Sequence, residues 1–340
     1  MTRQYNMGVA SVLPSHYSQG FLILKAEGNL LSDSISSTGL SSDISLEYIL
    51  ECLRDAQDVV LPARALSKAL QAPVFVVGCP RSGTTVLGKS LAAHPNLAGS
   101  EESLFLLDLW RIILDLHQGI NRRRWAPLSN YVTLPSLVDV SGEFADRIFS
   151  GLLAGAKNVR LVEHTPWYAG LEPLLGSLFP DCYVLHLIRD GRDVVESLSN
   201  SYERGFQWAG ASTRTRTTFW AGLVEASWKG SRHLKSERYR EFRYEDLCRM
   251  PRETLGAILQ WIGLEWDERV LIPLSEQHAS PSRPKSALAT IDENGAVHVK
   301  SRIVGGRWPP NWSRAKKQEF IEQGNATLAR HGYPALSAEE

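Results

Sequence analysis

Residues 74–94, VFVVGCPRSGTTVLGKSLAAH, combine an apolar run, a turn with two glycines and a helical pattern. Gly78, Gly83 and Thr85 have the spacing of the phosphate-binding loop G-x-x-x-x-G-K-[ST], but Thr84 stands where that motif has lysine. Backbone N–H groups at a helix start lack intrahelical partners, so such a turn binds anions. Without the lysine that reaches the outer phosphates, the loop suits a single terminal phosphate better than a magnesium-bound pair. An ordinary strand-to-helix turn is the alternative.

The string PRSGTT after an apolar run resembles the 5′-phosphosulfate loop of sulfotransferases that use 3′-phosphoadenosine 5′-phosphosulfate (PAPS). The AHPNLAGSEES that follows resembles the corresponding stretch of tyrosylprotein sulfotransferases and their bacterial relatives, where a pair of glutamates follows His-Pro. This resemblance implies that the loop binds the phosphate that carries the sulfuryl group. The residues implied are Arg81, Ser82, Gly83, Thr84 and Thr85.

The second signature of this family is an arginine with a serine eight residues later, which together hold the 3′-phosphate. IRDGRDVVESL supplies Arg189 and Ser197 at this spacing. Strand end, loop and helix start again converge on an anion, and two such sites are more specific than either alone. The resemblance covers roughly residues 74–120, 160–205 and 240–270, with a weaker match near residues 300–308.

Sulfuryl transfer is an in-line displacement in which positioning and electrostatics supply most of the rate. A hydroxyl acceptor needs a base within hydrogen-bond reach. The resemblance implies Glu102 as that base, with Glu101 in reserve, and Arg81 as the group that stabilises charge on the bridging oxygen. Because carboxylates are favoured near helix starts, the two glutamates could instead open the next helix.

His164, in VEHTPWY, stands where bacterial relatives have the lysine of E-K-T-P, which contacts the leaving phosphate and sulfuryl oxygens. The histidine could act as a cation, donate a proton or fill a structural place at a strand end. Lys300, in VHVKSRIVGGRW, resembles a late lysine that closes over the cofactor in relatives, and a solvent-exposed lysine is its alternative.

Two other function classes stay open. A P-loop kinase or NTPase would be expected to have lysine at position 84 and a magnesium-binding aspartate after an apolar strand. The best such aspartate, Asp190, lies inside the 3′-phosphate signature. A non-catalytic protein that binds 3′-phosphoadenosine 5′-phosphate (PAP) would keep both phosphate sites without turnover, and His164 in the lysine position is the feature in its favour.

Strand-like and helix-like segments alternate along the chain. The patterns predict strands at residues 73–78, 158–164, 181–190 and 241–247, and helices at residues 43–60, 84–94, 103–118, 193–205, 251–264 and 313–333. The alternation predicts an α/β fold with a parallel sheet flanked by helices, and the resemblance makes it P-loop-type and sulfotransferase-like. We expect a polar N-terminal arm over residues 1–45 and a single sulfotransferase domain over residues 46–340.

The composition excludes several partners. The 37 basic and 37 acidic side chains cancel, so no global field attracts nucleic acid or a membrane. Four cysteines without C-x-x-C spacing predict neither a disulfide framework nor a zinc site. No signal peptide or spanning apolar run is found. We therefore expect a cytoplasmic protein. The resemblance implies that it is a PAPS-dependent, metal-independent enzyme whose acceptor is a small molecule or peptide with a hydroxyl, or less favourably an amine.

Overall fold

The computed structural model describes residues 59–66, 70–99, 101–119, 131–153, 159–275, 289–291, 297–299 and 312–337. The N-terminal arm, Lys300 and all but the last two residues of the helix predicted at 43–60 lie outside these ranges. The domain boundary near residue 45 therefore stays a prediction.

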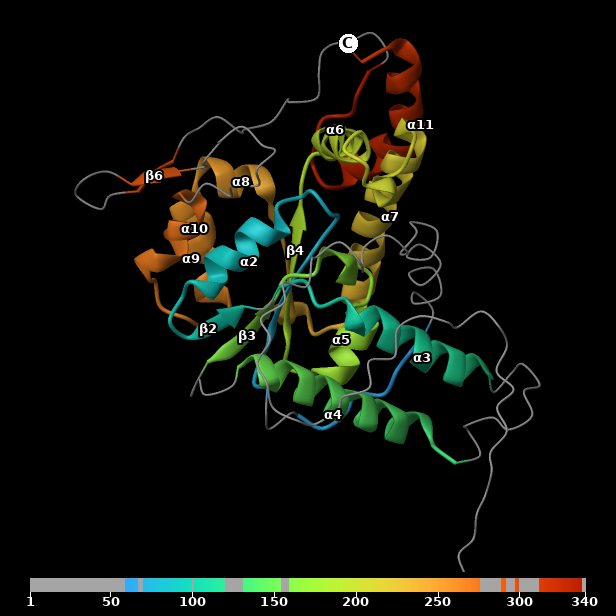
Figure 1. Ribbon diagram of the computed structural model, residues 1–340, viewed down its shortest axis with the longest axis vertical. Coiled ribbons are helices and arrows are strands. Elements are labelled where there is room, and N and C mark those ends of the chain that lie inside the picture. Colours follow the sequence, from blue (N-terminus) through green and yellow to red (C-terminus); the bar gives the residue numbers. More distant parts are fainter. Residues whose placement is uncertain are drawn as a thin grey trace, which may run out of the picture. The chain divides into compact units, whose positions relative to one another are not determined.

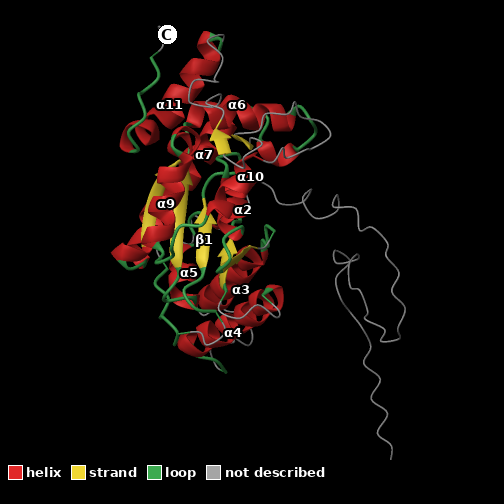
Figure 2. Ribbon diagram, turned by 90° about the vertical axis from the view of Figure 1, so that its left-hand side faces the viewer, coloured by secondary structure: helices red, strands yellow, loops and turns green. Residues whose placement is uncertain are grey.

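A central sheet of five parallel strands has the order β2-β3-β1-β4-β5. These strands are β1 (Val74–Val77), β2 (Leu97–Gly99), β3 (Arg160–Glu163), β4 (Tyr183–Ile188) and β5 (Tyr239–Arg243). A separate antiparallel pair consists of β6 (Ala289–Ile291) and β7 (Val297–Val299). Helices lie on both faces of the central sheet (Figures 1 and 2), so the α/β prediction is confirmed.

The sheet divides the apolar core in two, because alternate side chains of a strand point to opposite faces. Phe75 and Val77 belong to one buried cluster, and Val74 and Val76 to the other. The first is covered by α3 (Phe105–Gly119), α4 (Leu134–Leu152), α5 (Glu172–Leu178), α6 (Gly191–Tyr202), α7 (Thr213–Gly230) and α11 (Arg314–Arg330). The second is covered by α2 (Thr84–Ala92), α8 (Tyr244–Arg249), α9 (Pro251–Trp261) and α10 (Ile272–Ser275).

Buried aromatic rings hold β1 in place on the first face. Phe75 is fully buried, and its ring centroid lies 6.3 Å from that of Phe149 on α4 and 5.3 Å from that of Phe179. Each such ring contributes about 1.5–3 kcal/mol by leaving water. The strand that precedes the glycine turn is therefore fixed before any ligand binds.

Predicted helix ends agree with the structure at several positions. Ser313 caps α11 by accepting a hydrogen bond from the backbone N of Lys316 at 3.2 Å, and Pro251 opens α9. Gly332, beyond the end of α11, has the left-handed φ of 71° that favours glycine. The strand predicted over residues 241–247 was wrong after residue 243, because α8 begins there with two acidic residues in its first turn.

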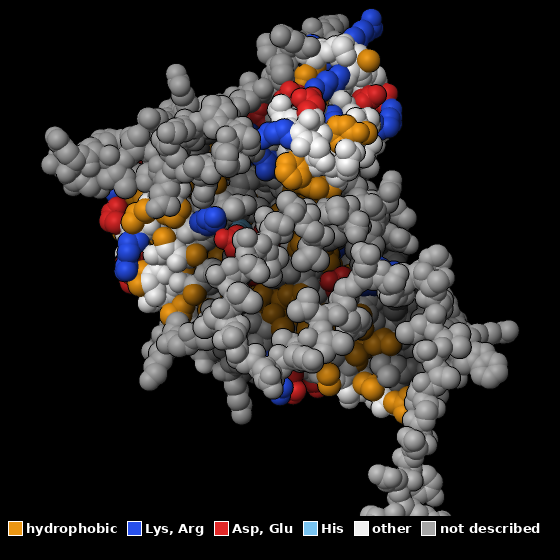
Figure 3. Space-filling view, in the orientation of Figure 1, with side chains coloured by type: hydrophobic (Ala, Val, Ile, Leu, Met, Phe, Trp, Pro, Cys, Tyr) orange, Lys and Arg blue, Asp and Glu red, His pale blue; other side chains and the backbone are white. Residues whose placement is uncertain are grey.

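Acidic and basic side chains lie interspersed on the described surface seen in Figure 3, while apolar side chains gather near α3 and α4. Exposed apolar residues of these two helices include Ile112, Val140, Phe144 and Ile148. Within the described ranges, no helix combines the length and the hydropathy needed to cross a bilayer.

Candidate functional site

The candidate residues in the described part of the chain follow the carboxyl ends of four neighbouring strands. Glu102 follows β2, His164 follows β3, the loop with Arg81 follows β1, and Arg189 follows β4. These strands are adjacent and parallel in the order β2-β3-β1-β4. Ligands of open α/β sheets bind at this edge, where neighbouring connections diverge. The fold thus brings segments far apart in the sequence to one edge.

The loop between β1 and α2, residues 78–83, is shaped by two glycines. Gly78 and Gly83 have φ of 154° and 99°, values that residues other than glycine rarely adopt. A Cβ at Gly78 would lie 2.5 Å from the backbone O of Leu187, and one at Gly83 would lie 2.5 Å from the Tyr244 ring. The backbone therefore passes closer to its neighbours than any side chain would allow.

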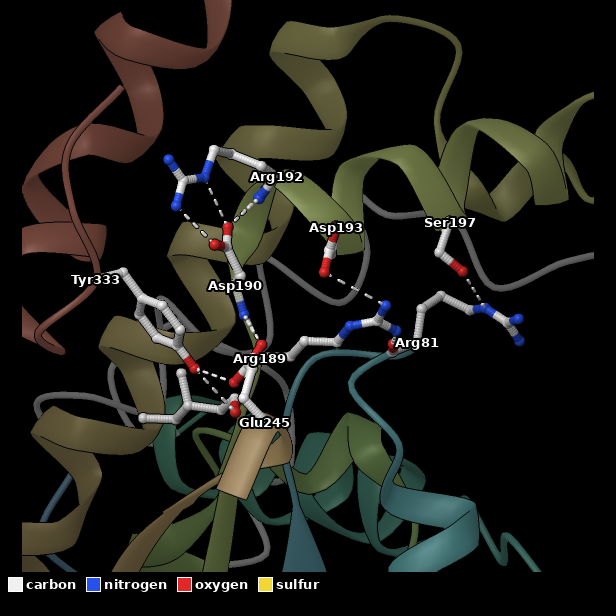
Figure 4. Close-up of polar contacts among 9 residues, drawn as sticks. Arg81, Arg189, Asp190, Arg192, Asp193, Ser197, Glu245 and Tyr333 are labelled. Carbon is white, nitrogen blue, oxygen red and sulfur yellow. Dashed lines mark hydrogen bonds and ion pairs between the residues drawn. The ribbon is translucent and has the colours of Figure 1, made fainter. Parts of the chain in front are cut away.

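Arg81 has a strained backbone in this loop, with φ of 76° for a residue that carries a Cβ. Its Nε donates a hydrogen bond to Ser197 Oγ at 3.1 Å. Its backbone O accepts a hydrogen bond from Arg189 Nη1 at 3.0 Å. The loop and the Arg189/Ser197 pair, which the sequence placed in two separate phosphate sites, are thus in direct contact (Figure 4).

The Arg189 guanidinium lies near the Asp193 carboxylate and the Tyr244 ring. Its Nη2 lies 3.7 Å from Asp193 Oδ2, and its guanidinium carbon lies 4.7 Å from the centroid of the Tyr244 ring. Its Nε is buried and has no hydrogen-bond partner among the described residues. Ser82 Oγ in the loop is buried and unpartnered in the same sense. Orphaned buried donors of this kind indicate a ligand site.

Asp190 is engaged by Arg192 rather than exposed at the site. Its two carboxylate oxygens accept hydrogen bonds from Nε and Nη2 of Arg192 at 2.9 and 2.7 Å. One of these oxygens also caps α6 by accepting from the backbone N of Arg192. Among the described residues, no group of three or more His, Cys, Asp and Glu side chains is arranged to hold a metal ion.

Glu102 lies beside the start of α2. Burial raises the pKa of its carboxyl, the negative charge of Glu101 raises it further, and a hydrogen bond with Thr85 lowers it. The residue is nevertheless exposed to solvent, so the burial of its carboxyl is only partial. Glu101 is 85% exposed and lies 3.9 Å from Lys89 Nζ. Both glutamates precede α3, which begins only at residue 105, so they do not form its first turn.

Glu163, the last residue of β3, is a buried carboxyl that the sequence reasoning missed. It accepts hydrogen bonds from Ser103 Oγ at 3.1 Å, from Thr165 N at 2.9 Å and from Thr165 Oγ1 at 2.6 Å. Burial outweighs these bonds and raises its pKa to about 7. Through Ser103 and Thr165, Glu163 thereby connects the segment that contains Glu102 to the turn that contains His164. A glutamate at the end of a buried strand was the available signal.

His164 is buried, with 2% of its surface exposed. Its ring packs on α2, where a Cβ at Gly88 would lie 2.5 Å from His164 Cγ. Burial lowers the pKa of His164, the charge of Glu101 raises it and that of Lys89 lowers it, with a net decrease. The ring is therefore neutral near pH 7. Neither ring nitrogen has a hydrogen-bond partner among the described residues.

The family model described as "Sulfotransferase family" matches residues 73–268, which is more than half of the chain. The chain belongs to the sulfotransferase family. The matched range begins just before β1, contains the four strand ends described above and ends beyond α9.

Curated relatives of this sulfotransferase include protein-tyrosine sulfotransferases. Protein-tyrosine sulfotransferase A of Caenorhabditis elegans is 25% identical over 204 residues, 58% of this chain and 51% of the relative. Nodulation protein NoeE of Sinorhizobium fredii (strain NBRC 101917 / NGR234) is 29% identical over 135 residues, 38% of this chain and 31% of the relative. The chain spans about half the length of the protein-tyrosine sulfotransferase.

Solved structures similar to this sulfotransferase include the sulfotransferase domain from the curacin biosynthetic pathway. That match has a TM-score of 0.49 at 16% identity and covers 78% of this chain and 99% of that domain. Mouse sulfotransferase SULT7A1 complexed with PAP matches with a TM-score of 0.44 at 16% identity, covering 85% of this chain and 91% of that one.

Proposed function

We propose that this protein transfers a sulfuryl group from PAPS to an acceptor hydroxyl. The observation that carries the proposal is the contact between Arg81 and Ser197 at 3.1 Å, in a chain of the sulfotransferase family. It joins the loop after β1 to the helix after β4, so two elements suited to anion binding lie within reach of one nucleotide that carries two phosphate groups.

The residues at this edge fit such a nucleotide. Ser82 Oγ and Arg189 Nε are buried donors without hydrogen-bond partners among the described residues, and Gly78 and Gly83 give the loop a curvature that other residues rarely adopt. Loop residues 81–85 would hold the 5′-phosphosulfate, while Arg189 and Ser197 would hold the 3′-phosphate. PAPS supplies the sulfuryl group when it is bound. The proposed contact with Lys300 concerns a residue outside the described ranges.

Glu102 is the proposed general base. It would accept the proton of the acceptor hydroxyl as the oxygen attacks, and its raised pKa suits this role because a base works best near the operating pH. Arg81 would stabilise negative charge at the bridging oxygen. Its hydrogen bond to Ser197 and its strained backbone hold the positive charge in place beforehand, which is how electrostatic stabilisation is most effective.

His164 would act as a neutral imidazole. Its pKa is lowered by burial, and both nitrogens are free of partners among the described residues. One nitrogen can then donate a hydrogen bond to an anionic oxygen while the other accepts one. This is a weaker electrostatic contact than the lysine of bacterial relatives would provide.

The acceptor is proposed by class only. The protein-tyrosine sulfotransferases among the relatives are named for a protein tyrosine, which carries a phenolic hydroxyl. For this chain we propose a hydroxyl on a peptide or a small molecule.

A transfer assay tests the proposal. The protein is incubated with PAPS labelled in the sulfuryl group and a panel of tyrosine peptides, phenols and alcohols. The proposal predicts labelled acceptor together with an equal amount of PAP, and loss of both with Arg81→Ala. Label released only as sulfate, at the same rate with every acceptor and with Arg81→Ala, would contradict it.

A further inference from the structure

The segment that follows α11, residues 331–336, lies against β5 and the start of α8. Every second residue from Glu241 to Glu245 contacts it. Glu241 Oε2 lies 3.2 Å from His331 Nδ1. Arg243 donates to the backbone O of His331 and lies 4.5 Å from the centroid of the Tyr333 ring. Glu245 Oε2 accepts a hydrogen bond from the Tyr333 hydroxyl at 2.8 Å.

The contact between Tyr333 and Glu245 continues to the residues on either side of Arg189. Glu245 Oε1 accepts a hydrogen bond from the backbone N of Asp190 at 3.0 Å. The Tyr333 hydroxyl also lies 3.3 Å from the backbone O of Ile188. Tyr333, Glu245 and Asp190 are all buried. Figure 4 shows this chain of contacts ending beside the Arg189 side chain.

We propose that Tyr333 is a positioning residue for the 3′-phosphate, acting through Glu245 on the backbone of Arg189. The inference rests on the proposed function, because it assumes that Arg189 binds that phosphate. A guanidinium holds a phosphate well only when its backbone is fixed, since any freedom must be lost on binding. Tyr333 lies outside the matched range 73–268, so the family match does not extend to it.

The Tyr333 hydroxyl can be removed without releasing the segment. The contacts of His331 with Glu241 and Arg243 do not involve it, and phenylalanine keeps the ring beside Arg243. Among the described residues, the Glu245 carboxylate accepts from the Tyr333 hydroxyl and from the backbone N of Asp190, and Tyr333→Phe removes the first of these donors. The carboxylate is then less well fixed, and we expect the hydrogen bond to Asp190 to weaken. The effect is therefore expected at the Arg189 side chain.

The test measures dissociation constants of PAP and of adenosine 5′-phosphate, which differ only in the 3′-phosphate, by calorimetry. For Tyr333→Phe we expect the PAP constant to rise roughly threefold to tenfold, the size of one hydrogen bond. The adenosine 5′-phosphate constant should stay within about twofold. Tyr239→Phe is the matched control, because its hydroxyl also bonds a carboxylate of the same region: Tyr239 on β5 contacts His186 on β4 at 2.7 Å and Glu241 on β5 at 3.1 Å.

Glu245→Gln, which keeps one acceptor oxygen and loses the charge, should show the same selective loss of PAP. Equal weakening of both nucleotides, or the same change in Tyr239→Phe, would overturn the proposal. So would an unchanged PAP constant in Tyr333→Phe while the wild type prefers PAP, and that outcome leaves the proposed function standing. A wild type without preference for PAP overturns both.

Discussion

Glu101 and Glu102 are neighbours in the chain but differ in surroundings. Glu102 is bonded to Thr85 at the start of α2, and burial raises its pKa. Glu101 is 85% exposed and lies 3.9 Å from Lys89. Of the two carboxylates, Glu102 is therefore the one whose surroundings suit the proposed role as general base.

Replacing Glu102 by glutamine removes a proton acceptor while keeping its shape. We expect Glu102→Gln to lower kcat by roughly 10²–10⁴-fold, as loss of a general base does, with the PAP dissociation constant unchanged. Glu101→Gln is the control and should stay within about twofold of the wild type. Steady-state kinetics and calorimetry measure the two quantities. Wild-type turnover in Glu102→Gln would remove the base assignment.

At His164, we expect that introducing the lysine of the bacterial relatives does not raise turnover. The residue is 2% exposed, and burial lowers the pKa of its ring, with a further decrease from the charge of Lys89. Among the described residues, the charged neighbours of this ring are the exposed Glu101 and the cation Lys89, so a second ammonium buried there would be poorly compensated in the free protein. We therefore expect His164→Gln to retain more turnover than His164→Lys, with thermal unfolding confirming that both fold. Wild-type or higher kcat in His164→Lys would contradict this expectation and would show that a cation at this position supports turnover.

At the scale of elements, the loop and α2 depend on a close approach that only glycine permits. Gly83 combines φ of 99° with a Cβ position 2.5 Å from the Tyr244 ring. Gly205 has nearly the same φ, 96°, but no heavy atom lies within 4 Å of its Cβ position. Comparing substitutions at Gly83 and Gly205 therefore distinguishes the effect of backbone strain, present at both, from the steric conflict present only at Gly83.

Both Gly83→Ala and Gly205→Ala should lose about 1–2 kcal/mol of stability from left-handed backbone strain. We expect Gly83→Ala alone to weaken PAP binding, by roughly tenfold or more, because the loop must shift away from Tyr244. Denaturant unfolding and calorimetry measure the two effects. Equal PAP affinity in the two variants would show that the loop backbone does not bind the nucleotide.

Local signals predicted the elements around the proposed phosphate sites. The apolar run of β1, the glycines of the loop and the cap Ser313 act over a few residues and can be found by pattern. Helix α7 was missed, because eleven of its eighteen residues are buried and it presents no clear polar face. Helix α4 was missed although Thr133 caps it by accepting from Ser136 N.

The contacts within the site were less accessible to sequence reasoning. The spacing of Arg189 and Ser197 identified the pair, and the resemblance pointed to Glu102. Nothing in the sequence indicated that Arg81 reaches Ser197 or that Tyr333 reaches Glu245. These contacts join residues more than 80 positions apart, and they follow from the order of the strands rather than from local pattern.

At the scale of the whole molecule, a second buried carboxyl links α5 to α7. Glu172 is fully buried and accepts a hydrogen bond from Ser227 Oγ. Burial outweighs its hydrogen bonds and raises its pKa to about 8 from 4.5. In the folded protein this residue therefore keeps its proton at pH values where the unfolded chain has lost it.

Stability should fall as pH rises from 4.5 to about 8 because of Glu172, since the folded state binds more protons than the unfolded state in this window. Glu172→Gln has no proton to lose and should lack this part of the fall. Thermal unfolding from about pH 5 to pH 8.5 measures it as the difference between the two proteins, in which other titrating groups cancel. Parallel curves would contradict the raised pKa.

The most direct test of the account is a calorimetric titration of the wild-type protein with PAP, beside ADP and ATP with and without magnesium. The account predicts binding of PAP that does not need magnesium and is clearly tighter than that of ADP, because both phosphate sites are engaged. Preference for ATP with magnesium would contradict the sulfotransferase account and favour a nucleoside triphosphatase (NTPase), despite Thr84 in the lysine position.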